Sequence, residues 1–234
     1  MRALGPAFKA LGYALAGALL LAAAVQLWFF AQVSWYRVFN PGSTAFMEAS
    51  LDRLRERNPR AQLKRQWVPY ERISGHLKRA VVAAEDAKFL DHEGFDWEAI
   101  QKAIEKNERR GRVVAGASTI SQQLAKNLFL SGERSWLRKG QEAVITWMIE
   151  TLLSKHRILE LYLNVAEWGD GVFGAEAAAR QHFGVPAAAL SSDQAAWLAA
   201  ILPSPRRYER GRLTPYIAGR AATIRARMPA AAIP

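Results

Sequence analysis

The longest apolar segment of the chain lies near its N-terminus. From Ala10 to Val33 there are 24 residues without a charged side chain, and only Gln26 and Gln32 are strongly polar. As a helix this segment would be roughly 36 Å long, which is enough to cross the hydrocarbon core of a bilayer. The pattern predicts one transmembrane helix over residues 10–33.

The residues around this segment predict its orientation. Arg2 and Lys9 precede it, and large aromatic residues gather at its far end, as at a membrane interface. Positive charge favours the cytoplasmic side, so residues 1–9 are expected in the cytoplasm and the rest of the chain outside. A cleaved signal peptide is the alternative, because Ala22–Ala24 follow an apolar stretch. The apolar run continues beyond them, which favours an uncleaved anchor.

Beyond the anchor, apolar residues recur at helical spacing and strand-like alternation is scarce. Residues 34–66 are interpreted as a charged juxtamembrane helix and a linker, and residues 67–234 as one mainly helical domain. The pairing of Ser191 with Gln194 predicts a capping box, and Gly184 predicts a C-terminal cap. Helices are predicted over 75–89, 96–109, 118–130, 135–153, 155–164, 172–183, 192–202 and 215–228.

Charge and cysteine content narrow the chemistry. The chain carries 32 Lys and Arg against 21 Asp and Glu, a formal net charge of +11. This indicates an anionic partner, which could be nucleic acid, a membrane surface or a phosphorylated ligand. An extracytoplasmic domain argues against nucleic acid. There is no cysteine, which excludes disulfides, thiolate metal sites and cysteine nucleophiles. We find no motif for a dedicated metal site.

A first candidate group runs from Glu85 to Asp96. Counting 100° per residue along the predicted helix, Glu85 lies at the edge of an apolar face and Asp86 points away from it. A carboxylate beside an apolar wall can have a pKa suited to a general base, although an ordinary charged residue at a helix boundary has the same pattern. His92 is interpreted as a residue that hydrogen-bonds within a turn or caps a helix.

A second group predicts a polar helix face that carries one cation and no acid. Ser118 near the helix start would add unpaired backbone N–H groups. This set is typical of an anion or sugar site, although a neutral surface face with a capping serine fits as well. The two rows of this face are Ser118, Gln122 and Lys126, and Thr119, Gln123 and Asn127.

A third group consists of Arg134, Arg138, Lys139 and Glu142. Arg138 and Glu142 are four residues apart, so they could form an ordinary ion pair on a wet helix face. The segment Arg206–Arg227 contains seven arginines and one glutamate, and we expect it to face the membrane surface.

Together with two further segments, these groups resemble the peptidoglycan glycosyltransferase family, found in bifunctional penicillin-binding proteins and as stand-alone enzymes. The family pattern ED-x2-F-x2-H-x-G-x-D is matched from Glu85, and G-x-STI-x-QQ-x2-KN from Gly116. K-x2-ILE-x-YLN and G-x2-G-x3-AA-x3-FG are matched from Lys155 and Gly171. The third pattern, RK-x2-E-x3-A-x2-LE, departs only at Thr146 and Ile149. The resemblance covers about residues 66–228.

The resemblance implies a lysozyme-like, mainly helical fold that polymerises lipid II into β-1,4-linked glycan strands with inversion, releasing undecaprenyl pyrophosphate. Glu85 matches the general base and Glu142 a second essential acid. The matched substrate-binding residues are Ser118, Gln122, Gln123, Lys126, Asn127, Arg134, Arg138 and Lys139, with Lys126 and Arg134 on the pyrophosphate. A divalent cation, Mg or Mn, is expected only together with that pyrophosphate.

The implied partners are lipid II, the growing glycan strand, the bilayer and other cell-wall synthesis proteins. The implied location is the bacterial inner membrane, with the domain on the periplasmic side. Because the chain ends at Pro234, a monofunctional enzyme is expected. Two alternatives stay open: a membrane-anchored, lysozyme-like enzyme that cleaves preformed glycan, and a non-catalytic scaffold for other wall enzymes.

Overall fold

The computed structural model describes residues 6–114, 116–130, 135–208 and 214–234 and is built mainly of helices, which confirms the predicted fold class. The helices are α1 (Pro6–Trp35), α2 (Ala45–Arg57), α3 (Gly75–Glu85), α4 (Trp97–Arg110), α5 (Ile120–Phe129), α6 (Trp136–Leu152), α7 (Lys155–Val165), α8 (Ala175–Phe183), α9 (Ser192–Ile201) and α10 (Pro215–Arg227). The strands are β1 (Lys64–Arg65), β2 (Glu167–Gly169) and β3 (Val172–Phe173).

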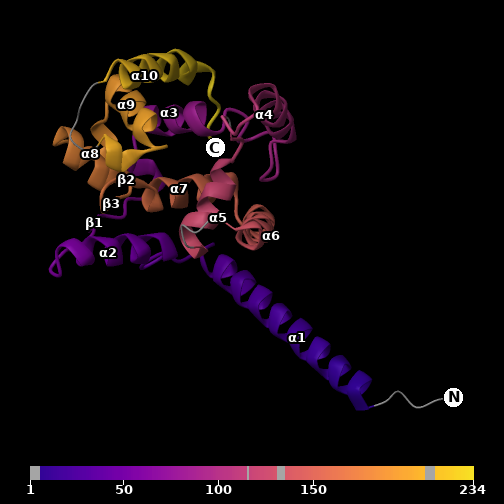
Figure 1. Ribbon diagram of the computed structural model, residues 1–234. Coiled ribbons are helices and arrows are strands. Elements are labelled where there is room, and N and C mark those ends of the chain that lie inside the picture. Colours follow the sequence, from indigo (N-terminus) through magenta and orange to yellow (C-terminus); the bar gives the residue numbers. More distant parts are fainter. Residues whose placement is uncertain (1–5, 115, 131–134, 209–213) are drawn as a thin grey trace.

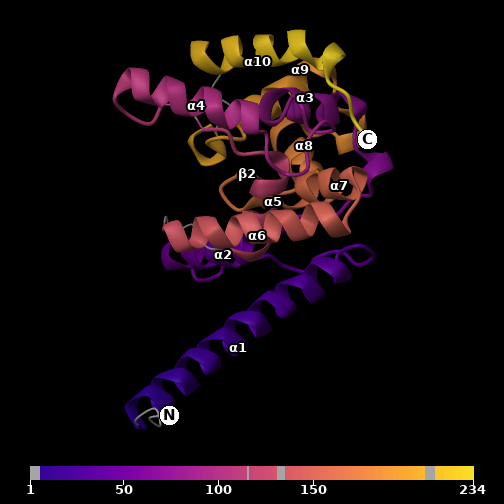
Figure 2. The ribbon, with the colours of Figure 1, turned by 90° about the vertical axis from the view of Figure 1, so that its right-hand side faces the viewer.

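The helix α1 extends from the remaining elements as a long rod (Figures 1 and 2). Its segment Phe8–Trp35 is long and apolar enough to cross a membrane. Most of its large apolar side chains are exposed, but Phe29 and Val33 near its C-terminal end are buried. There the side-chain amide of Gln26 exchanges two hydrogen bonds, 2.8 and 3.0 Å long, with Gln141 of α6. The end of α1 is therefore packed against the helical domain.

Two groups of helices form the core. At one end of the molecule α9 contacts both α3 and α10, and nearer to α1 the helix α5 contacts α2, α6 and α7 (Figure 1). The largest fully buried side chains are Trp168, Tyr162, Phe89 and Phe173. Burial of these apolar faces from water is what stabilises such short helices.

The predicted helix ends at Ser191 and Gly184 are confirmed. Ser191 and Gln194 form a capping box, and Gly184 caps α8 in the left-handed conformation with φ 69°. Other predicted boundaries are wrong. The helix predicted over 75–89 ends at Glu85, and the one predicted over 118–130 begins only at Ile120.

A small sheet interrupts the helices and was not predicted. Its strand order is β1-β3-β2, with β1 parallel and β2 antiparallel to β3. For this reason α8 begins at Ala175, three residues after the predicted start at 172. Strands of two and three residues are too short to show an alternating pattern, so the sequence carries no periodic signal for them.

Candidate active site

Four helices, α2, α3, α5 and α6, and the loop before α5 enclose a hollow of about 410 Å³. Its lining contains eight of the ten residues that the sequence singled out, together with Phe46 of α2. The acidic member from α3 is Glu85. The residues that line the hollow are Phe46, Glu85, Ser118, Gln122, Gln123, Lys126, Arg138, Lys139 and Glu142. The structure thus joins the first, second and third candidate groups in one place.

The other two predicted site residues do not line this hollow. Asn127 is a buried residue of α5. Arg134 lies outside the described residues. Ser118 is at the hollow but precedes the helix, because the cap of α5 is Thr119. The Thr119 hydroxyl accepts from Gln122 N at 3.2 Å, and Thr119 N donates to Gln122 Oε1 at 3.0 Å. The expected helical row from Ser118 is therefore wrong at its first member.

Glu85 is the last residue of α3, and its side chain is only 11% exposed. Its Oε2 accepts a hydrogen bond of 2.9 Å from Gln123 Nε2, and its Oε1 lies 3.5 Å from Arg220 Nη2. Burial raises the pKa of the Glu85 carboxyl, while the bond from Gln123 and the charges of Arg220 and Lys126 oppose that rise. The carboxyl is therefore a stronger base than an exposed glutamate.

Asp86 does not point away from the core, contrary to the prediction. Its carboxylate is buried and accepts from Ile120 N, the first residue of α5, at 3.0 Å and from His92 Nε2 at 2.8 Å. Helical counting fails here because Asp86 is the C-cap of α3 and leaves the helix with φ −162°. His92 Nδ1 accepts from Gly94 N at 3.1 Å, which confirms the interpretation of His92 as a turn residue.

The turn after α3 is joined closely to α5 and α6. Thr119 Oγ1 donates to the carbonyl of Gly94 at 2.7 Å. Gly94 has φ +90°, and a Cβ there would lie 2.8 Å from Thr146 Cγ2 and 3.0 Å from Glu150 Cγ. Both the backbone conformation and the close approach of α6 require glycine at this position. These contacts fix the end of α3, and hence Glu85, relative to α5.

The opposite wall of the hollow is cationic. Glu142 of α6 is 4% exposed, and its two carboxylate oxygens accept from Arg138 Nη1 at 2.8 Å and from Lys139 Nζ. The predicted ion pair between Arg138 and Glu142 is therefore confirmed, but it does not lie on a wet helix face, because the Arg138 side chain is only 19% exposed and that of Glu142 is buried. Lys126 has no hydrogen-bond or ion-pair partner among the described residues, and burial lowers the pKa of its amino group.

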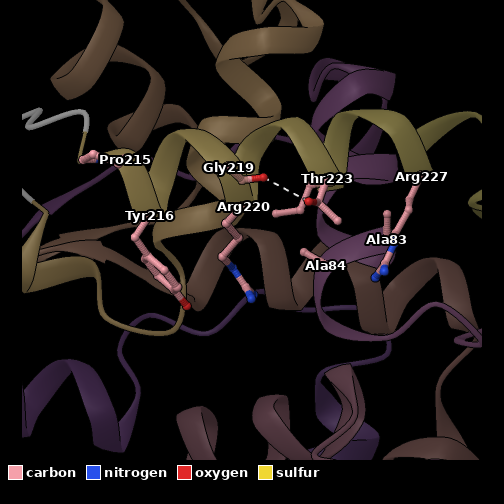
Figure 3. A pocket seen from close by; sticks show the side chains of 9 residues that line it. Ala83, Ala84, Pro215, Tyr216, Gly219, Arg220, Thr223 and Arg227 are labelled. Carbon is pink, nitrogen blue, oxygen red and sulfur yellow. Dashed lines mark hydrogen bonds between the residues drawn. The ribbon is translucent and has the colours of Figure 1, made fainter.

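Two residues at the site were missed by the sequence reasoning, Phe46 and Arg220. Arg220 lines a second hollow of about 580 Å³ between α3 and α10, in which its side chain projects from α10 beside Tyr216 (Figure 3). Its Nη2 lies 3.5 Å from Glu85 Oε1, so Arg220 links the second hollow to the carboxylate that lines the first. The expectation that the arginines of 206–227 face the membrane surface is therefore wrong for Arg220.

A signal for Arg220 was present in the sequence. Arg220 lies three residues after Ile217 and four before Ile224, and both isoleucines are buried. An arginine on the apolar face of a helix indicates a buried acidic partner. Phe46 gave no such signal, because an aromatic residue on an amphipathic helix is most simply a core residue.

Within the described residues, no group of three or more His, Asp or Glu side chains is placed to hold a metal ion. The carboxylate nearest to the cationic wall, Glu142, has both oxygens engaged by Arg138 and Lys139. These residues are suited to an anion rather than to a resident divalent cation.

Comparison with known proteins identifies the family that this chain resembles. A model of the transglycosylase family matches residues 51–229. The biosynthetic peptidoglycan transglycosylase of Azoarcus sp. (strain BH72) is 62% identical over 224 residues, which cover 96% of each chain. The protein of that name from Janthinobacterium sp. (strain Marseille) is 59% identical over 92% of this chain and 93% of its own. The one from Bordetella pertussis (strain Tohama I) is 57% identical over 97% and 96%.

The family match begins within α2 and extends past the end of α10, so it contains every residue that lines the hollow except Phe46, and the similarity to these relatives extends over nearly the whole chain. The chain belongs to the transglycosylase family and, like these relatives, is a glycosyltransferase.

Proposed function

We propose that this protein polymerises lipid II into β-1,4-linked glycan strands of peptidoglycan, with inversion and with release of undecaprenyl pyrophosphate. The observation that carries the proposal is one hollow in which a buried carboxylate, Glu85, shares the lining with the cations Lys126, Arg138 and Lys139. A base and an anion site side by side are what transfer of a sugar from a pyrophosphate donor requires.

Glu85 acts as the general base in this proposal. Its carboxylate takes the proton from the 4-hydroxyl of the acceptor, lipid II, as that oxygen attacks the anomeric carbon of the growing strand. The new carbon–oxygen bond forms on the face opposite the pyrophosphate, whose own bond to that carbon breaks, so the configuration inverts. The raised pKa of Glu85 makes its carboxylate a better proton acceptor, and the proton then passes from Glu85 to water.

The cationic wall stabilises the leaving group. A pyrophosphate departs as an anion and needs charge neutralisation more than a proton. We assign this role to Lys126, Arg138 and Lys139, and by the motif match to Arg134. Glu142 accepts from Arg138 and Lys139 and thereby orients both toward the hollow. Ser118, Gln122 and Gln123 offer hydrogen bonds to the donor, and Asn127 supports α5 from its buried position.

No step of this mechanism depends on a metal. The residues of the hollow do not fit a resident divalent cation, because Glu142 is fully engaged and its neighbours are cationic. A magnesium or manganese ion enters this proposal only as a companion of the bound pyrophosphate.

The helix α1 is proposed as a single-pass anchor in the bacterial inner membrane, with the N-terminus in the cytoplasm and the domain in the periplasm. Because the chain has no cysteine, one introduced cysteine reports its own side of the membrane. Lys102→Cys on the exposed face of α4 is expected to react with a membrane-impermeant maleimide in intact spheroplasts. Protection of that thiol until lysis would contradict this topology.

The proposal is tested with purified lipid II in detergent. Wild-type protein is expected to form glycan polymer and to release undecaprenyl pyrophosphate in step with it. Lys126→Ala is expected to weaken donor binding strongly, while Lys102→Ala, which removes the same charge from an exposed pair with Glu98, leaves it unchanged. Equal damage by both substitutions would contradict specific pyrophosphate binding.

The same assay separates the two alternatives. A glycan-cleaving enzyme would shorten isolated cell-wall glycan without releasing undecaprenyl pyrophosphate. A scaffold would support growth of cells equally well with Glu85→Gln. Other cell-wall synthesis proteins are the partners proposed for the basic, anchored domain, and nucleic acid is not among them.

A further inference from the structure

Phe46 brings the juxtamembrane helix α2 into the active site. Its half-buried ring lines the same hollow as Glu85 and Lys126. Lys126 Nζ lies 5.9 Å from the centroid of the ring, and Arg206 Cζ also lies 5.9 Å from it. A cation within about 6 Å of an aromatic ring face is attracted by the ring quadrupole.

This attraction matters most for Lys126. Its ammonium group is largely buried, and within the described part of the chain no carboxylate pairs with it directly. Burial lowers the pKa of Lys126 because it removes water from the ammonium group. The charged form therefore depends on weaker interactions with neighbouring side chains. Phe46 is the aromatic neighbour that stabilises the charged form without occupying its hydrogen-bond donors, which stay available for an anionic ligand.

A buried carboxylate, Glu167 of β2, holds α2 in this position. Glu167 is 7% exposed and accepts from Ser50 Oγ of α2 at 3.0 Å. It also accepts from Arg206 Nη2 at 2.8 Å and lies 3.5 Å from Arg53 Nη2. Glu167 therefore links α2 to Arg206, the second cation that lies near the Phe46 ring.

Close packing supports the same placement. Gly171, in the turn between β2 and β3, has φ +74°, and a Cβ there would lie 2.6 Å from Leu54 Cδ1 of α2. α2 also contacts α5, the helix that carries Lys126. The helix α2 is thus fixed by an ionic cluster and by steric fit on the wall of the hollow.

We infer that α2 is a functional part of the active-site wall. In this arrangement Phe46 positions the Lys126 ammonium group toward the substrate pyrophosphate, and Glu167 positions Phe46. Both are positioning residues and act through Lys126. This inference rests on the proposed function, since it takes Lys126 as the ligand of that pyrophosphate. It makes the segment between the anchor and the domain part of the substrate site rather than a passive linker.

The test compares Phe46→Leu with Phe46→Tyr in the full chain. Phe46→Leu is expected to weaken binding of undecaprenyl pyrophosphate in detergent by about three- to tenfold, and to raise KM for lipid II by a similar factor. The effect on kcat is expected to stay within about twofold, because Glu85 is untouched. Phe46→Tyr retains an aromatic ring and is expected to bind like the wild type.

A pH profile separates this role from a merely structural one. The alkaline loss of activity reports deprotonation of Lys126, so Phe46→Leu is expected to move it to lower pH and Phe46→Tyr to leave it in place. Glu167→Gln provides a second variant that keeps the ring and removes the charge that holds Arg206. It is expected to weaken binding in the same direction, whereas Arg109→Gln, at an exposed ion pair with Glu105 on α4, changes nothing.

Failure of the proposed function and failure of this inference alone would give different results. Wild-type protein that forms no polymer, or Lys126→Ala that binds undecaprenyl pyrophosphate as tightly as wild type, would overturn the proposed function and this inference with it. Lys126→Ala with weakened binding, combined with Phe46→Leu that binds like wild type and keeps its alkaline limb, would overturn this inference alone.

Discussion

The amide of Gln123 donates a hydrogen bond of 2.9 Å to Glu85 Oε2. At its other end, Gln123 Oε1 accepts from the hydroxyl of Tyr162, also at 2.9 Å, which fixes the direction of the amide. Tyr162 is fully buried, so the chain of three side chains is anchored in the core. The core thus orients the Glu85 carboxylate, while Arg220 approaches its other oxygen from α10.

The first prediction concerns the acidic limb of the activity profile. Glu85 must be ionised to accept a proton, and its raised pKa moves the loss of activity on acidification above the range of an exposed glutamate. Arg220 lowers the pKa of Glu85, so Arg220→Met is expected to move this limb to higher pH. Initial rates of lipid II polymerisation across the pH range measure it. Arg225→Met removes an exposed pair with Asp193 and is the control, expected to leave the limb in place.

The second prediction concerns stability. The pKa of Glu85 is higher in the folded than in the unfolded chain, so the folded state loses this proton at a higher pH. As pH rises between the two pKa values, ionisation of Glu85 therefore lowers the stability of the folded protein. Glu85→Gln removes the buried charge and is expected to unfold at an equal or higher temperature than the wild type. The difference is expected to grow as pH rises through that window. A lower midpoint for Glu85→Gln at neutral pH would contradict it.

The third prediction concerns the turn after α3. Gly94→Ala adds a Cβ at φ +90° within 2.8 Å of Thr146, so we expect it to lower the free energy of unfolding by at least about 2 kcal/mol. Gly111→Ala, at φ +61° with no atom within 4 Å, tests strain alone and is expected to lose about 1–2 kcal/mol. Urea unfolding measures both. Equal losses would show that the approach of α6 to Gly94 is unimportant.

The fourth prediction concerns Glu142. Its replacement by glutamine leaves Arg138 and Lys139 without their buried counter-charge, so the variant is expected to lose about 1–3 kcal/mol of stability and most of its donor binding. Glu105→Gln, at an exposed pair with Arg109, is the matched control and is expected to change neither. Unchanged binding of undecaprenyl pyrophosphate by Glu142→Gln would refute its role in orienting the two cations.

Much of this site could be predicted from the sequence because its helices carry the information locally. The spacing of Gln122, Gln123 and Lys126 places them on a single helix whose register is set by the capping box at Thr119. The five short sequence patterns that the chain shares with one family indicated that Glu85 and Glu142 belong to the same active site. The structure places both at one hollow.

The remaining features depend on contacts between residues distant in the chain. Arg220 is 135 residues from Glu85, and Glu167 is 117 residues from Ser50. Helical counting does not extend past a cap, and therefore it misplaced Asp86. The ends of helices and the pairing of very short strands are decided by tertiary contacts, which periodicity does not encode.

The central claim is that Glu85 is the base of a lipid II polymerase. It is tested most directly by the rate at which wild-type and Glu85→Gln proteins form glycan polymer from purified lipid II, each checked for folding by thermal unfolding. We predict that the folded Glu85→Gln variant loses nearly all polymerisation, by a factor of at least about 100, while it still binds undecaprenyl pyrophosphate. Polymerisation by Glu85→Gln at the wild-type rate would contradict the account.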